Sequence, residues 1–360
     1  MQKKPFFSIV IPTFNRVKDL QFALYCIFQQ SFTDFEIIIS DNCSTDDTSE
    51  VIAKLKDRRI RYFKNKKNIG VIPNVKQGIK YVEGVYIFLH SDDDFLIYNG
   101  SLQEIYNKIT KYKLGYIRVG YLSLTPDKKH VFDFRASKVF VRNQYLSPSS
   151  ENKQILSFIL DTDATFVTGL VFRNYQKRHV EIIKSEFIPW IEILFSVTKN
   201  FGAYYIAKPH IIASWSEWRI EENGYHLLYG LINGKLTIEN YLKAVQKKID
   251  SREYRLFLHN ILMRMYVLGI PAIKLYTGNK NMLQLLARIR SLYPSISHNK
   301  TFWIYLILAF LVPRICLKVV RIIYFYKYVK FSKIANYEQV NSTLRILNEK
   351  YARDDIFKNL

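Results

Sequence analysis

The sequence predicts an α/β fold with a mostly parallel central sheet flanked by helices, followed by a helical C-terminal region. Over the first 100 residues, short β-branched and aromatic runs alternate with helical apolar stripes, which is typical of βαβ units. After about residue 225, segments of helical spacing follow one another with few turn signals. We therefore predict an α/β domain over residues 1–225, divided near residue 110, and a helical region over residues 226–360.

The strand and helix signals of the first domain follow one another in a regular order. Short runs rich in β-branched and aromatic residues predict strands at residues 7–11, 35–40, 60–63, 85–89, 116–124, 130–134, 165–173, 204–207 and 211–215. Apolar stripes of helical spacing predict helices at residues 17–28, 44–56, 73–81 and 188–199. N-cap residues from Ser44 to Asp47 begin the second of these helices, and Pro73 or Asn74 begins the third.

The composition indicates a folded protein of a reducing compartment. The chain has 360 residues, 49% of them hydrophobic, which allows a sizeable core and argues against disorder. Its three cysteines are odd in number and lack metal-type spacing, so we expect no disulfide framework. The apolar start from Phe6 to Ile11 is too short for a signal peptide and ends at Pro12. It is predicted to be the first strand of a cytoplasmic domain.

Positive charge is concentrated in the C-terminal third. The formal net charge is +22, and the span from Tyr254 to Tyr337 has thirteen Lys or Arg but no Asp or Glu. A basic field fits either a nucleic acid or an anionic membrane surface. No nucleic-acid module is recognisable in this strongly apolar part, so we predict the membrane surface and no nucleic acid as partner.

The same region predicts helices at residues 236–248, 255–268 and 281–292. The apolar segment Phe302 to Leu311 has ten residues, whereas a membrane span needs ~20. Beyond Pro313, basic residues recur at helical spacing among apolar ones, at Arg314, Lys318 and Arg321. We predict a basic, amphipathic, membrane-associating segment at about residues 300–333. A helical hairpin packed on the first domain is the alternative.

An acidic run, Ser91-Asp92-Asp93-Asp94, directly follows the apolar strand at Val85 to Leu89 and His90. Three consecutive carboxylates at the end of a buried strand repel one another and require a counter-charge. A divalent cation with oxygen ligands, bridging to a phosphate, supplies it. Ligands of open α/β sheets bind at the carboxyl ends of such strands. A solvated acidic turn is the alternative for the run taken alone.

Four segments stand in order at the ends of successive predicted strands: Ser8 to Arg16, Ser40 to Asp46, Asn68 to Gly70, and Ser91 to Asp94. Together they resemble the nucleotide-sugar half of the family 2 glycosyltransferases with the Rossmann-like GT-A fold. The resemblance covers residues 6–110 strongly and residues 160–220 in outline. It implies transfer of a sugar from a nucleotide diphospho-sugar in a single displacement with inversion.

The resemblance also implies roles for individual residues. The first loop, with Pro12, Thr13, Asn15 and Arg16, falls where the family contacts the base and phosphates. Asp41 falls where a carboxylate binds uracil, with a turn or cap role as its alternative. Asn68 and Gly70 match the loop that closes beside the nucleotide.

In the acidic run, the resemblance implies that Asp93 coordinates Mn²⁺ or Mg²⁺. Asp92 would lie near the ribose or the metal, and Asp94 would act as support or second ligand. The metal would neutralise charge on the diphosphate as the glycosidic bond breaks.

The general base is the main departure from the family. Pro189 and Trp190 stand where the family usually has a Glu-Asp pair. We predict Glu192 as the base, with Glu186 second, and a structural helix residue as the alternative for Glu192. The aromatic loop from Trp215 to Arg219 is a candidate contact for the acceptor or a lipid-linked substrate.

The sequence therefore predicts an inverting, divalent-metal-dependent glycosyltransferase of cell-surface polysaccharide synthesis. Its donor is expected to be a UDP-linked sugar and its acceptor a glycan or lipid-linked glycan, at the cytoplasmic face of the inner membrane. One alternative is a catalytically degenerate family member, because the Glu-Asp pair is missing. Another is a basic protein that binds membrane or nucleic acid. A nucleotidyltransferase would need a glycine-rich first loop, which Pro12 to Arg16 is not.

Overall fold

The computed structural model describes residues 4–124, 131–132, 142–162, 164, 166–174, 190–214, 231–232, 235–236, 239–247, 249–263, 270–313, 315–317, 319 and 338–350. The chain forms two compact units. One comprises Met1–Ile183, Trp190–Trp215 and Ser332–Leu360, and the other comprises Lys184–Pro189 and Ser216–Phe331. The domain boundary predicted near residue 225 lies outside the described residues.

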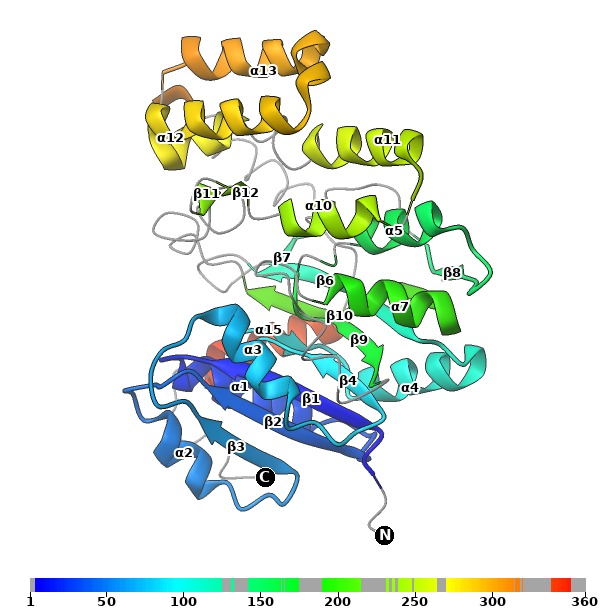
Figure 1. Cartoon of the computed structure of the whole chain (residues 1–360). Coiled ribbons are helices and arrows are strands. Elements are labelled where there is room, and N and C mark those ends of the chain that lie inside the picture. The colour runs from blue at the N-terminus through cyan, green and yellow to red at the C-terminus, as the bar shows by residue number, and fades with distance from the viewer. Residues whose placement is uncertain are drawn as a thin grey trace. The chain divides into compact units, whose positions relative to one another are not determined.

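The first unit is built on one large sheet with strand order β3-β2-β1-β4-β9-β6-β10-β5 (Figure 1). The strands β3, β2, β1 and β4 are mutually parallel, as predicted for the first half. The next strand, β9, is antiparallel to both β4 and β6, so the second half of the sheet is mixed. The strand bounds are β1 Phe7–Thr13, β2 Phe35–Asp41, β3 Ile60–Lys64, β4 Tyr86–Leu89, β5 Phe95–Leu96, β6 Tyr116–Leu124, β7 Val131–Phe132, β8 Gln144–Leu146, β9 Leu170–Arg173 and β10 Ala203–Ser214.

The register brings three strand ends to the same edge of the sheet. Thr13, the last residue of β1, pairs with Asp41, the last residue of β2. On the other side of β1, Val10 pairs with Leu89, the last residue of β4. The loops after β1, β2 and β4 therefore leave from neighbouring points, as the parallel arrangement requires.

Helices cover both faces of the parallel half. On one face, alternate residues of β1 (Phe7, Ile9 and Ile11) join a buried cluster with Leu20 and Leu24 of α1. On the other face, Gly78 of α3 lies so close to Val10 that an added Cβ would stand 2.7 Å from its Cγ1 atom. The described helices of this unit are α1 Val17–Phe28, α2 Thr48–Lys54, α3 Val71–Ile79, α4 Ser101–Tyr112, α5 Asn152–Asp161, α7 Ile191–Phe201 and α15 Glu338–Lys350.

The last described helix, α15, belongs to the first unit although it follows the second in sequence. Val340, Leu344 and Leu347 are buried in the same cluster as α1, and Thr343 Oγ1 donates to the carbonyl of Ile97 at 3.3 Å. Full burial of such side chains stabilises a fold by about 1.5–3 kcal/mol each. The chain thus closes the core of its N-terminal domain with a C-terminal helix.

The second unit is mainly helical. It contains the short hairpin β11 Leu231–Ile232 and β12 Lys235–Leu236, then α10 Glu239–Gln246, α11 Ser251–Leu262, α12 Ile270–Leu292, the 3-10 helix η4 Pro294–His298 and α13 Lys300–Leu311. Within the described part of the chain, no helix combines the length and apolar character needed to cross a membrane. Arg314, Lys318 and Arg321 of the predicted amphipathic segment lie outside the described residues.

Candidate active site

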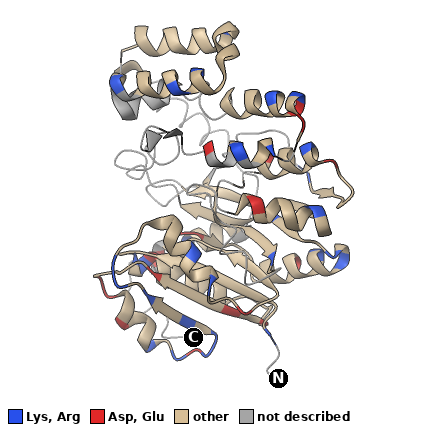
Figure 2. Ribbon diagram, in the orientation of Figure 1, with Lys and Arg blue, Asp and Glu red and all other residues tan. Residues whose placement is uncertain are grey.

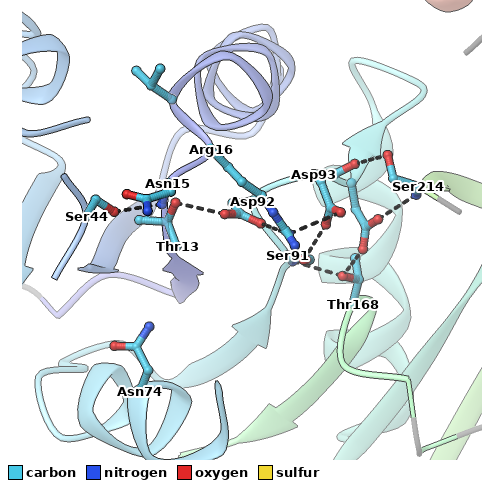
Figure 3. Close-up of polar contacts among 12 residues, drawn as sticks. Thr13, Asn15, Arg16, Ser44, Asn74, Ser91, Asp92, Asp93, Thr168 and Ser214 are labelled. Carbon is cyan, nitrogen blue, oxygen red and sulfur yellow. Dashed lines mark hydrogen bonds and ion pairs between the residues drawn. The ribbon is translucent and has the colours of Figure 1, made fainter. Parts of the chain in front are cut away.

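The acidic run meets the first loop at the carboxyl ends of β1 and β4 (Figure 3). Thr13 Oγ1 donates to Asp92 Oδ2 at 2.8 Å, and Arg16 Nη1 donates to Asp92 Oδ1 at 3.0 Å. The same guanidinium nitrogen lies 3.3 Å from Asp93 Oδ2, and Ser91 Oγ donates to Asp93 Oδ1 at 2.6 Å. Two predicted donor-binding residues, Thr13 and Arg16, are therefore in direct contact with the acidic run.

The three carboxyl groups are nearly completely buried, and this burial governs their protonation. Burial and the charge of Asp93 raise the pKa of Asp92 to about 7, against the opposing effects of Arg16 and Thr13. Burial raises the pKa of Asp93 as well. Burial and the charge of Asp93 hold the pKa of Asp94 well above its usual range. The run thus concentrates more negative charge than its neighbours compensate, so an added cation would favour the ionised form.

The donor set fits a hard divalent cation. One oxygen atom of Asp92 and one of Asp93 lie 3.0 and 3.3 Å from the same nitrogen of the Arg16 guanidinium, Nη1. Within the described ranges, no group of three or more His, Cys, Asp or Glu side chains is arranged to hold a metal ion. Asp92 and Asp93 would supply two carboxylates, as is common for Mg²⁺, whose other ligands are water and substrate phosphate.

Asp94 has different surroundings from its two neighbours. Thr168 Oγ1 donates to one of its carboxylate oxygens, and the backbone N–H of Ser214 donates to the other at 2.8 Å. Thr168 Oγ1 also accepts from the N–H of Ser91 at 2.9 Å, and Ser214 Oγ donates to the carbonyl of Asp93. These contacts favour the supporting role for Asp94, one of the two that the sequence left open.

Thr168 is itself held by a buried arginine that we did not predict as a site residue. Arg118 of β6 is fully buried, donates from Nε to the carbonyl of Thr162 at 2.8 Å, and donates from Nη1 to the carbonyl of Thr168. Gly169 has a φ of +82°, and a Cβ there would stand 3.0 Å from Arg118 Nη1, so glycine allows this close approach. A charged residue inside the apolar run of residues 116–124 was the signal available in the sequence.

The loops after β1 and β2 are joined by short polar side chains. Asn15, at a φ of 51°, accepts from the N–H of Thr45 at 2.7 Å, and its own N–H donates to Ser44 Oγ at 2.9 Å. Asp46 accepts from the N–H of Val17 at 3.0 Å and so caps α1 from the neighbouring loop. Pro12 lies within β1, paired with Ser40. The first loop is therefore fixed by hydrogen bonds to the second.

Asp41 is completely buried. Its carboxylate accepts from the N–H of Ser44 at 2.8 Å and from the hydroxyl of Tyr62. Tyr62 lies on β3, and burial together with the bond to Asp41 raises its pKa. These contacts correspond to the turn-forming alternative. A carboxylate has about four acceptor positions, so these two contacts leave capacity for about two further donors.

Asn68 and Gly70 join an asparagine network at this edge of the sheet. The side chain of Asn42 donates to Asn68 Oδ1 at 2.7 Å and accepts from the N–H of Ile69 at 2.9 Å. Gly70 has a φ of 86° and its N–H donates to Asn68 Oδ1 at 2.9 Å. Asn74 of α3 donates to the carbonyl of Ser40 at 2.7 Å. Asn65 joins this network by donating from Nδ2 to Asn74 Oδ1 at 2.8 Å. The predicted loop thus sits beside β2, and Asn42, Asn65 and Asn74 are members that we did not predict.

The predicted general base lies at the beginning of α7. Glu192 is the second residue of this helix and is partly buried. Trp190, just before it, is buried and donates from Nε1 to the carbonyl of Ala164 at 2.6 Å. That bond ties the start of α7 to the segment that carries Thr168. Glu186 and the loop from Trp215 to Arg219 lie outside the described residues.

Comparison with known proteins gives the family of this chain. The profile of "Glycosyl transferase family 2" matches residues 8–131, which include the first loop and the acidic run. A curated protein of Campylobacter jejuni, GalNAc(5)-diNAcBac-PP-undecaprenol beta-1,3-glucosyltransferase, is 37% identical over 251 residues, which are 68% of this chain and 77% of that protein.

Two further proteins show shorter or weaker likeness. The Escherichia coli protein UDP-Glc:alpha-D-GlcNAc-diphosphoundecaprenol beta-1,3-glucosyltransferase WfaP is 38% identical over 87 residues, 24% of this chain and 35% of that protein. The crystal structure of S. aureus TarS 1-349 in complex with UDP-GlcNAc is 13% identical, with a TM-score of 0.47 over 82% of this chain and 92% of that one. This structural likeness is too weak to add to the sequence evidence. Because the match to the Campylobacter jejuni relative covers 68% of this chain at 37% identity, the chain belongs to glycosyl transferase family 2.

Proposed function

We propose that this glycosyltransferase transfers glucose from UDP-glucose to a glycan carried on a polyprenyl diphosphate, in the synthesis of a cell-surface polysaccharide. The contact of Thr13 and Arg16 with the acidic run at the carboxyl ends of β1 and β4 carries the proposal for the donor. The names of two relatives, both beta-1,3-glucosyltransferases acting on undecaprenyl-diphosphate-linked glycans, support the acceptor class and the sugar.

On this proposal, the diphosphate of the donor lies against the first loop and the acidic run. Arg16, which already pairs with two carboxylates, would turn a guanidinium N–H to a phosphate oxygen. Asp92 and Asp93 would hold Mn²⁺ or Mg²⁺. When bound, the ion would neutralise negative charge on the diphosphate leaving group. Asp94, bound by Thr168 and Ser214, keeps this turn in place. Asp41 and Asn68 lie at the neighbouring strand end, where the base would bind.

The transfer is proposed to be a single displacement with inversion. The acceptor hydroxyl oxygen bonds to the anomeric carbon, the bond from that carbon to the β-phosphate oxygen breaks, and the hydroxyl proton passes to a carboxylate. Glu192 is the proposed base, with Glu186 as the second candidate. A beta product from the alpha-linked glucose of UDP-glucose agrees with inversion, and both relatives are named for beta products.

The experiment is a transfer assay with radiolabelled UDP-glucose, Mn²⁺ and an undecaprenyl-diphosphate-linked oligosaccharide. We expect label in the lipid fraction and release of UDP in equal amounts. Other nucleotide sugars, tested in parallel, identify the donor if UDP-glucose is inactive. Absence of transfer and of nucleotide release with every donor would contradict the proposed function.

A second arm of the assay tests the base. Glu192→Gln should lower kcat by about 10²–10⁴-fold while leaving the KM for the donor nearly unchanged. Glu50→Gln, at an exposed position on α2, is the matched control and should behave like the wild type. An unchanged kcat for Glu192→Gln would remove Glu192 from the mechanism and direct the same test to Glu186.

The location proposed for the reaction is the cytoplasmic face of the membrane.

A further inference from the structure

Helix α13 leaves a broad apolar surface in solvent. Of its twelve residues, only Phe302 and Ala309 are buried, and these lie on one face because they are seven positions apart. The opposite face exposes 54% of Ile304, 51% of Ile307 and 75% of Leu311. We call this surface the α13 stripe; its members are Trp303, Ile304, Ile307, Leu308 and Leu311. Soluble monomers rarely expose a contiguous apolar patch of this kind without a function for it.

The helix is firmly anchored on its own unit, so the stripe is a fixed surface. The buried face of α13 packs on α12 and on η4. The Asn299 side chain caps the helix by accepting from the N–H of Phe302 at 3.1 Å. Trp303 is oriented by its indole N–H, which donates to the carbonyl of Ser297 at 2.7 Å. Beyond Pro313, Ile315 is also exposed, at 71%.

The charges near the stripe are positive. Lys300 begins α13, and Lys280 and Arg290 are exposed on α12. Figure 2 shows charged residues on α12, whereas α13 is uncharged along nearly all of its length. The sequence from Tyr254 to Tyr337 has thirteen Lys or Arg and no Asp or Glu, and one of the thirteen, Arg288, is paired with Glu239 of α10. An apolar stripe with a basic surround is complementary to a surface that is both apolar and anionic.

We propose that the α13 stripe docks on the surface of an anionic phospholipid bilayer. The twelve residues of the helix span about 18 Å, whereas the hydrocarbon core is about 30 Å thick. The helix would therefore lie in the plane of the interface, with its apolar side chains below the headgroups and the lysine and arginine side chains among them. A second copy of this chain fits less well, because it would bring like charges together.

This inference depends on the proposed function in one respect only. The purpose of the docking would be to hold the enzyme where a lipid-linked acceptor resides. The docking itself follows from exposure and charge. It can therefore be measured without any substrate.

The test is cosedimentation of the full chain with vesicles. One set contains equal parts of phosphatidylcholine and phosphatidylglycerol, and the other contains phosphatidylcholine alone. We expect at least about tenfold tighter binding to the anionic set. Leu311→Glu should weaken that binding by about tenfold or more, because it removes a large apolar side chain from the interface and adds a negative charge. Leu256→Glu, the same change at a 61% exposed leucine of α11, is the matched control and should stay within about twofold of the wild type.

Several results would overturn the proposal. One is equal binding of Leu311→Glu and the wild type to anionic vesicles. Another is a dimer, seen by light scattering, that Leu311→Glu dissociates while neither protein binds vesicles, since the stripe would then contact a second copy. A loss of binding in Leu256→Glu as large as that in Leu311→Glu would also contradict a role specific to α13. Thermal unfolding of both variants confirms that each is folded.

A separate measurement keeps this inference distinct from the proposed function. With a short soluble acceptor, Leu311→Glu should retain the transfer rate of the wild type and lose rate only with acceptor embedded in vesicles. Vesicle binding without transfer to any acceptor would contradict the proposed function and leave the docking intact. An equal loss of rate with both acceptor forms would contradict the docking role.

Discussion

The Nη1 atom of Arg16 lies 3.0 Å from Asp92 Oδ1, across the gap between the loop after β1 and the turn after β4. The two residues are 76 positions apart in sequence and meet because β1 and β4 are adjacent parallel strands. A positively charged group from one loop thus faces the acidic run at the edge where α/β sheets bind ligands. This pair is the centre of the proposed donor site.

Removal of the guanidinium should weaken donor binding. Arg16→Ala is expected to raise the Kd for UDP by about 10–100-fold, because charge-assisted hydrogen bonds of about 1.5–3 kcal/mol are lost. Isothermal titration in the presence of Mn²⁺ measures the effect. Arg59→Ala removes a different Arg–Asp pair, in which Arg59 lies 2.7 Å from Asp57, and should leave the Kd unchanged. Equal Kd values for Arg16→Ala and the wild type would exclude Arg16 from the donor site.

The raised pKa of Asp92 makes a prediction about stability. The carboxyl group of Asp92 has a pKa of about 7 in the folded state, against 3.8 in the unfolded chain, so the folded state binds its proton more tightly. The wild type therefore loses stability as the pH rises between these two values and the carboxyl group ionises. Asp92→Asn should therefore increase the free energy of unfolding at pH 8, without divalent cation, by roughly 2–4 kcal/mol, and the gain should shrink towards pH 4. Urea unfolding at several pH values measures it.

The same pair of proteins also tests cation binding. Mn²⁺ should raise the melting temperature of the wild type and have little effect on Asp92→Asn. Equal shifts in both proteins would place the cation elsewhere.

Thr168 is expected to be a positioning residue for the acidic run. Thr168→Val removes the hydroxyl that contacts Asp94 and accepts from Ser91, so two buried polar groups lose a partner, at a cost of about 1–3 kcal/mol in stability. The concentration of Mn²⁺ needed for half-maximal UDP binding should also rise. Thr168→Ser restores the hydroxyl and should restore this concentration. A loss of stability with unchanged Mn²⁺ dependence would show that the role is structural only.

The parallel half of the fold could be predicted because its signals are local. The periodicity of the segments from Phe7 to Leu89 gave β1, β2, β3 and β4 within two residues of their observed ends. The structure adds that β1 and β4 are adjacent parallel strands, which brings Thr13 and Arg16 into contact with Asp92. The roles of Thr13, Arg16 and Asp92 in donor binding came from the resemblance to family 2 glycosyltransferases and remain predictions.

The support of the site could not be predicted, because it depends on distant pairings. Asp94 meets Thr168 and Ser214 across 74 and 120 positions of sequence, through the antiparallel strand β9 and the end of β10, whose register no local pattern fixes. We predicted a strand at residues 165–173, whereas β9 spans only Leu170–Arg173. The strand begins after Gly169 because the φ of +82° at this glycine departs from strand geometry. No local pattern in the sequence indicated that α15 packs in the first unit rather than in the second, so this could not be predicted either.

His90 should make the wild type sensitive to acid. It is completely buried, neither ring nitrogen makes a hydrogen bond of normal geometry within the described residues, and the backbone of Asp94 raises its pKa by less than burial lowers it. Burial lowers its pKa from 6.5 to about 4, so the unfolded chain binds the proton more tightly and the folded state loses stability as the pH falls from 6.5 to 4.

His90→Leu should remove this loss. Relative to the wild type, the variant should gain roughly 2 kcal/mol between pH 7 and pH 5, measured by urea unfolding. His298→Leu, at an exposed position, controls for the loss of a histidine as such. A stability difference between His90→Leu and the wild type that does not change with pH would show that His90 is not held neutral by burial.

The measurement that most directly tests the central claim is calorimetric titration of UDP into the wild type and into Asp93→Asn, with Mn²⁺ and with chelator. If Arg16 and the acidic run bind a diphosphate together with a cation, the wild type should bind UDP at least about tenfold more tightly with Mn²⁺ than with chelator. Asp93→Asn should lose that difference. UDP binding that is equally tight in all four titrations would contradict the account.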